Sequence, residues 1–122
     1  MQRNNVVKDK SFELAVNIVK LAVELQQKKE FVLSKQIIRS GSSVGALIRE
    51  AEHAESRADF IHKFGIAQKE INETLYWLEL LQATNFISRD KFEPLSKDVV
   101  EIRKIITRIL ITTKEKTGKN QL

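Results

Sequence analysis

The stretch that decides the fold is QIIRSGSSVGALIREAEHAESRADF, residues 36–60. It is typical of a long helix that ends near His53, a tight turn over residues 53–56, and the start of a second helix. Apolar and small residues recur there at steps of three or four, which places them on one helix face. These residues are Leu33, Ile37, Gly41, Val44, Ile48 and Ala51. We expect this face to form a seam of a helical bundle.

Gly41 and Gly45 lie four residues apart in the middle of that helix. A glycine inside a helix costs roughly 1 kcal/mol relative to alanine. Two glycines on one flank are explained if another helix approaches closely there, and the alternative is that they are tolerated without a packing role. We predict that they form a helix-packing motif.

Composition limits the number and kind of elements. A chain of 122 residues forms one domain, and one proline with four glycines leaves little material for turns, so we expect few, long elements. The absence of cysteine excludes disulfides and thiol catalysis. The polar N-terminus, MQRNNVVKDK, does not resemble a signal peptide, and no apolar run is long enough to span a membrane. We therefore expect a cytoplasmic protein with no membrane partner.

The pattern predicts four helices, over residues 9–28, 33–53, 57–84 and from after residue 88 to 116. Ser56 is positioned to cap the third helix, with Asp59 in its first turn. Pro94 disfavours helix at Glu93, so residues 88–93 are expected to form a separate turn or a kinked first turn. Residues 1–8 are expected to be a flexible arm, residues 9–116 the bundle, and residues 117–122 a disordered basic tail. The fold class is all-α, an antiparallel up-down-up-down four-helix bundle.

Several helices carry more apolar residues than one inward face requires. The first helix has two stripes, one of Phe12, Ala15, Val19 and Ala22 and one of Leu14, Ile18, Leu21 and Leu25. One stripe faces the core, and the other must be covered by a wider core or by another copy of the chain. The fourth helix has Ile105, Leu110 and Ile111 in excess. We predict an oligomer interface of Leu14, Ile18, Leu21, Leu25, Ile105 and Ile111.

The net charge of +5 lies on the terminal segments, since residues 1–10 carry +2, residues 97–122 carry +4 and the middle carries −1. Four antiparallel helices bring both termini to one end, so the terminal cations are expected to gather at a basic pole that could bind phosphate. The alternative is that lysine-rich ends are simply solvated. The candidate nucleic-acid-binding residues are Arg3, Lys8, Lys10, Arg39, Lys114, Lys116 and Lys119. Arg39, Arg49 and Glu50 are alternatively placed to form interhelical ion pairs.

Two spacings suggest chemistry. Glu50 and His53, like Asp59 and His62, form the i, i+3 pairs that hold di-iron centres in some bundles, but the other helices lack matching inward carboxylates. We therefore expect no metal and no cofactor. Arg57 and His62 match the Arg-x4-His spacing that resembles the catalytic motif of HEPN ribonucleases, without any supporting motif. We expect no enzymatic activity, and an RNA-cleaving enzyme that uses this pair remains an alternative.

The segment from Arg39 to Leu81 resembles a known family. The resemblance rests on runs that include Arg39-Ser40-Gly41, Ser43-Val44-Gly45-Ala46, Arg49-Glu50-Ala51, Ala54-Glu55-Ser56, Asp59-Phe60-Ile61-His62-Lys63 and Tyr76-Trp77-Leu78-Glu79-Leu80-Leu81. They are similar to the bacterial four helix bundle proteins, also called 23S rRNA intervening sequence proteins. More distantly, the chain resembles the accessory variability protein of diversity-generating retroelements, a basic homopentameric bundle that binds a reverse transcriptase and nucleic acid.

The resemblance implies a homopentameric ring, which would cover the surplus apolar stripes. Members commonly have asparagine where this chain has Leu47, so any role of that asparagine is missing here. Our hypothesis is a non-enzymatic, homo-oligomeric bundle that binds RNA or DNA through basic surface. The alternative is a purely structural ring or one that binds a protein partner.

Overall fold

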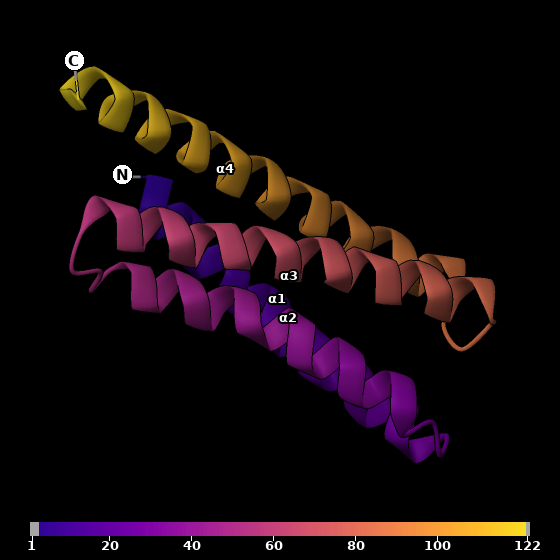
Figure 1. The fold of residues 1–122 in the computed structure, drawn as a ribbon. Coiled ribbons are helices and arrows are strands. Elements are labelled where there is room, and N and C mark those ends of the chain that lie inside the picture. Colours follow the sequence, from indigo (N-terminus) through magenta and orange to yellow (C-terminus); the bar gives the residue numbers. More distant parts are fainter. Residues whose placement is uncertain (1–2, 122) are drawn as a thin grey trace.

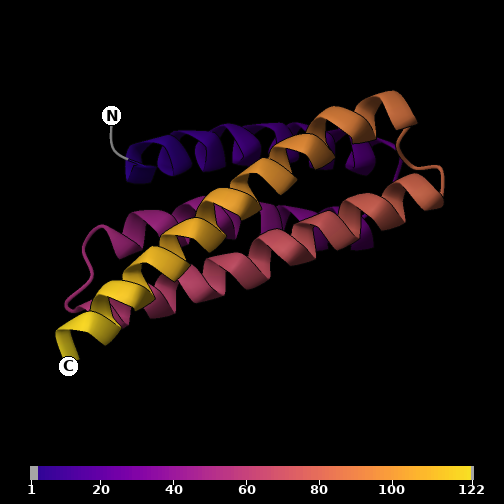
Figure 2. The same ribbon diagram turned by 90° about the horizontal axis from the view of Figure 1, so that it is seen from above.

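The computed structural model describes residues 3–121, with side chains from Val6 to Gly118. These residues form four helices and no strand: α1 (Arg3–Gln27), α2 (Val32–Ala51), α3 (Arg57–Ala83) and α4 (Arg89–Gln121). Each helix packs on the next one in the chain, and α4 returns to α1. Both termini lie at the same end of the bundle, and α4 crosses the other helices obliquely (Figures 1 and 2). The predicted antiparallel four-helix bundle is confirmed.

Short-range chemistry defines the helix ends. The Ser56 hydroxyl accepts a hydrogen bond from the Asp59 N–H at 3.0 Å, and Asp59 in turn accepts one from the Glu55 N–H, so the predicted N-terminal cap of α3 is confirmed. Lys29 and Asn85, which directly follow the ends of α1 and α3, adopt the left-handed conformation. Glycine usually occupies such a position, so no residue in the sequence indicates it here.

Two predicted helix boundaries are wrong. Helix α1 begins at Arg3 instead of near residue 9, and Val7, a residue of the predicted flexible arm, is fully buried in the core. Helix α4 continues to Gln121 through the predicted disordered tail, since lysines and a glutamate support helix up to Gly118. The same helix starts at Arg89, as predicted, but residues 89–93 belong to it and do not form a separate turn; the missing N–H of Pro94 affects only the exposed start of the helix. Residues 1, 2 and 122 lie outside the described part.

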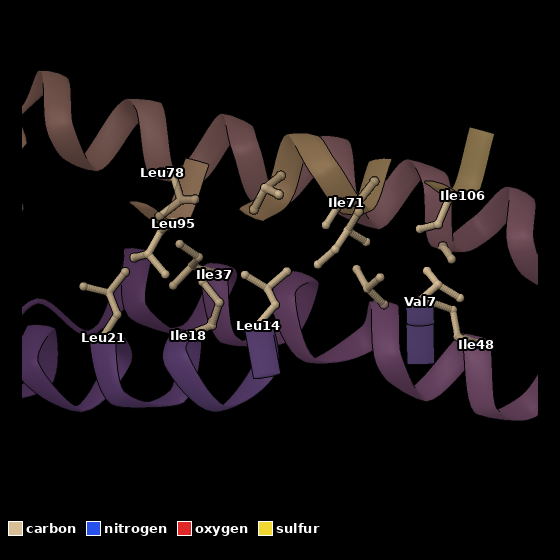
Figure 3. Close-up of a cluster of buried hydrophobic side chains, with 14 of the residues drawn as sticks. Val7, Leu14, Ile18, Leu21, Ile37, Ile48, Ile71, Leu78, Leu95 and Ile106 are labelled. Carbon is tan, nitrogen blue, oxygen red and sulfur yellow. The ribbon is translucent and has the colours of Figure 1, made fainter. Parts of the chain in front are cut away.

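The core runs the length of the bundle and receives one apolar stripe from every helix (Figure 3). Helix α2 contributes Ile37, Val44 and Ile48, all fully buried, as its periodicity predicts. Helix α3 contributes Phe64, Ala67, Ile71, Leu78 and Leu81, and helix α4 contributes Leu95, Val99, Ile102, Ile106 and Ile109, whereas Phe60 and Leu75 are only partly buried. The buried hydroxyl of Thr74 also lies in this layer and donates to the Ser40 hydroxyl at 3.0 Å. In the described residues no helix is both long and apolar enough to cross a membrane.

The predicted oligomer interface on α1 is wrong, because its residues belong to the core of a single chain. Leu14, Ile18, Leu21 and Leu25 are each at most 1% exposed. Ile105 is partly buried against the same core, and only Ile111 is open to solvent. Helix α1 is rotated so that Leu14, Ile18, Leu21 and Leu25 face inward, whereas the other stripe is divided, with Phe12 and Val19 exposed and Ala22 buried.

The orientation of α1 depends on its contact with the glycines of α2. A Cβ atom added at Gly41 would lie 2.8 Å from a side-chain carbon of Ile18, whereas one at Gly45 would lie 3.4 Å from the Ser11 hydroxyl and 3.5 Å from its carbonyl oxygen. Gly41 therefore makes room for the Ile18 side chain, and Gly45 faces the α1 backbone at ordinary contact distance.

The two glycines are expected to respond differently to substitution by alanine. Gly41→Ala should lower the free energy of unfolding, because overpacking typically costs about 1 to 3 kcal/mol. Gly45→Ala should leave stability unchanged or raise it by up to about 1 kcal/mol, since alanine favours helix and fits the space. Urea denaturation of both variants checks this, and equal stabilities would contradict it.

Candidate nucleic-acid interface

The predicted basic pole is only partly available to a ligand. Lys8 pairs with Glu52 at 3.2 Å and Lys10 with Glu101 at 2.6 Å, which ties α1 to the end of α2 and to α4. The hydrogen bond between Lys10 and Glu101 raises the pKa of the lysine and lowers the pKa of the glutamate. These two lysines therefore have neighbours that offset their charge.

Near the C-terminus, Lys114 and Lys116 are exposed. They form no ion pair with any side chain between Val6 and Gly118. The side chains of Arg3 and Lys119, also predicted for this pole, lie outside the described residues.

Arg39 ties α2 to α3. Its guanidinium donates to Glu70 at 3.0 Å and also to Glu73, and the Trp77 indole donates to Glu73 at 3.2 Å. The hydrogen bond from Arg39, helped by that from Trp77, lowers the pKa of Glu73. Of the two roles considered for Arg39, the geometry matches the interhelical ion pair.

The neighbouring charges of α2 also have partners. Glu50 pairs with Lys63 of α3 at 3.1 Å, which adds a third ion pair between these two helices to the two that Arg39 makes. Arg49 lies over the ring of Phe12 on α1, 5.1 Å from its centroid, and so makes a cation–π contact instead of an ion pair.

The richest row of available cations lies on α4, where the sequence analysis did not place it. Lys97, Lys104 and Arg108 are exposed, follow the spacing i, i+7, i+11, and pair with no described carboxylate. At about 100° per residue this spacing brings them onto one outward side of the helix. We call these three residues the α4 basic face; Lys114 and Lys116 lie further along the helix, about 100° to either side of it. The spacing of Lys97, Lys104 and Arg108 on the polar side of α4 is the sequence signal from which this row could have been predicted.

A second exposed surface is apolar. Phe12, Val16, Val19 and Val23 are 53%, 38%, 42% and 46% exposed, and their spacing of four, three and four aligns them along the outside of α1. We call them the α1 apolar stripe. Two of its members belong to the first of the two stripes that the sequence pattern gives this helix.

The structure offers no support for the two chemical alternatives. His53, Arg57 and His62 are all exposed, and His62 lies five positions after Arg57, so their side chains leave α3 about 140° apart. Among the described residues no three metal-ligating side chains form a group. The Arg-x4-His spacing therefore does not bring its two residues together in this chain.

The geometry defines an all-α antiparallel bundle with a charged outer face on its last helix. The family model described as 23S rRNA-intervening sequence protein matches residues 3–108, and the chain belongs to this family. It is also similar to a solved structure from Bacteroides thetaiotaomicron, described as a protein with unknown function from the S23 ribosomal protein family. The two are 57% identical with a TM-score of 0.87, over 89% of this chain and 98% of that one. No curated protein is significantly similar to the chain.

The lowered pKa of Glu73 predicts a pH-dependent contribution to stability. A carboxylate with a depressed pKa in the folded state stabilises the fold above its unfolded pKa of about 4.3, and this stabilisation disappears as the pH falls through the folded pKa. Glu73→Gln should therefore be less stable than the unmodified chain at pH 7, by no more than about 1 kcal/mol for so exposed a pair. The difference should become smaller in acid. Thermal unfolding at pH 7 and at a pH of about 3 measures it, and an equal difference at both values would contradict the prediction.

Proposed function

We propose that the protein is a non-enzymatic, self-associating helical bundle that binds nucleic acid through the α4 basic face. The observation that supports nucleic acid most directly is the row of Lys97, Lys104 and Arg108, exposed and without ion pairs among the described side chains. Lysine and arginine on such a row neutralise successive phosphates and release counterions.

Self-association is proposed to use the α1 apolar stripe. A continuous row of four apolar side chains on a helix exterior is unfavourable in water and is covered when another copy packs against it. The family resemblance leads us to expect five subunits. Several α4 basic faces on one assembly would bind the same nucleic-acid strand at once, so that avidity compensates for weak single contacts.

Binding should be sensitive to salt and to charge on α4. In filter binding to structured RNA, the double variant Lys104→Ala and Arg108→Ala should bind more weakly. The slope of log K against log salt should decrease in magnitude by roughly 1.4 to 1.8, because two fewer phosphates are neutralised.

The matched control for binding is Lys20→Ala with Lys35→Ala, which removes two exposed cations from α1 and α2. The control should bind as the unmodified chain does. Absence of salt-sensitive retention by the unmodified chain would contradict nucleic-acid binding. In that case a structural or protein-binding scaffold is the better account, provided that the chain still self-associates.

Self-association should depend on the α1 apolar stripe. Light scattering should give a mass well above the 14.1 kDa of one chain, near 70 kDa for five copies. Changing both Val16→Glu and Val19→Glu should reduce the mass to that of one chain, because charge cannot be buried without a partner. Asn17→Glu, an exposed change on the same helix, should not. A single-chain mass for the unmodified protein at high concentration would refute this part of the proposal.

A further inference from the structure

A shallow hollow of about 520 Å³ opens on the outer surface of the C-terminal half of α4. Three cations line it, Arg103, Lys104 and Arg108, against one carboxylate, Glu115 at its C-terminal end. Ile111 lies among them and is 53% exposed. The hollow therefore combines positive charge with an apolar surface, which phosphate binding alone does not require.

The edge of the hollow that faces α3 is held by two contacts from that helix. The Gln68 amide donates to the Thr107 hydroxyl at 2.9 Å, and Arg103 reaches the Asn72 side-chain oxygen at 3.5 Å. The Thr107 hydroxyl that accepts from Gln68 also carries a proton of its own, which it can donate to a ligand. Side chains already held in position lose less conformational freedom when a ligand binds.

Positive charge beside an exposed isoleucine favours single-stranded over double-stranded nucleic acid. A duplex presents phosphates and sugars on its outside and keeps its bases stacked, so it would leave Ile111 in water. A single strand can turn a base outward and place its flat apolar face on a side chain while the flanking phosphates meet the cations. Ile111 lies about 4.5 Å along the helix axis from Arg108, which is close enough for one nucleotide to contact both.

We propose that the hollow on α4 binds an unpaired nucleotide, with a base against Ile111 and its phosphates at Lys104 and Arg108, so that the protein prefers single-stranded RNA to duplex RNA. This inference rests on the proposed nucleic-acid binding and names the form of nucleic acid. Glu115 repels phosphate and marks the C-terminal limit of the contact.

Fluorescence anisotropy with one labelled RNA of about 12 nucleotides, alone and annealed to its complement, tests the inference. The duplex carries the higher charge density, so a purely electrostatic surface would favour it. We expect the single strand to bind about tenfold more tightly at the same salt, because only the single strand covers the apolar surface of Ile111. Ile111→Ala should weaken single-strand binding by about five- to tenfold, leave its salt dependence unchanged, and leave duplex binding unaffected.

Val32→Ala is the matched control, because Val32 is an equally β-branched residue, 71% exposed, at the opposite end of the bundle. It should bind the single strand as the unmodified chain does. Equal or tighter binding of the duplex, or equal affinities of the Ile111 and Val32 variants, would overturn the inference while leaving salt-sensitive binding intact. Absence of salt-sensitive binding to either RNA would instead overturn the proposed function, and the inference with it.

Discussion

The contact between Ile18 and Gly41 is the constraint on which the rest of the structure depends. The missing side chain at Gly41 lets Ile18 lie directly against α2, and this sets the rotation of α1 about its own axis. With Ile18 inward, Leu14, Leu21 and Leu25 follow into the core. The same rotation turns the α1 apolar stripe outward. One close contact therefore completes the core of the single chain and creates the apolar surface available to a second copy.

Contacts between helices also determine which charged side chains are paired. The seams between helices bring cations of α1 and α2 beside carboxylates of neighbouring helices, as in the pairs of Lys8 with Glu52 and of Arg39 with Glu70. Such pairs stabilise the fold modestly, and their carboxylates offset the positive charge that would otherwise attract phosphate. The outer side of α4 faces no other helix, so Lys104 and Arg108 keep their charge available. The distribution of net charge along the chain therefore predicts a basic site at the terminal lysines, whereas pairing between helices determines which cations remain accessible.

The parts that could be predicted from sequence are those governed by local chemistry. The periodicity of residues 33–51 identifies the buried face of α2 because a helix repeats every 3.6 residues, and Ser56 caps α3 through a contact only three residues away. The wrong predictions concern contacts between residues that are far apart in the sequence. The N-terminal residues read as a loose polar arm because nothing local shows that Val7 reaches the core. For the same reason, the sequence pattern predicts an oligomer interface at Leu14, Ile18, Leu21 and Leu25, although these residues lie in the core of a single chain.

The amino-acid sequence by itself determined the all-α class, the number of helices, their approximate limits and the excess of positive charge, because each follows from residue type and short-range spacing. Only the tertiary structure decided which stripe of α1 is buried, which cations are paired, and that Ile111 lies exposed among the cations of α4. Those features depend on how each helix is rotated against its neighbours. That rotation is determined by side-chain packing between residues far apart in the chain, such as Ile18 and Gly41.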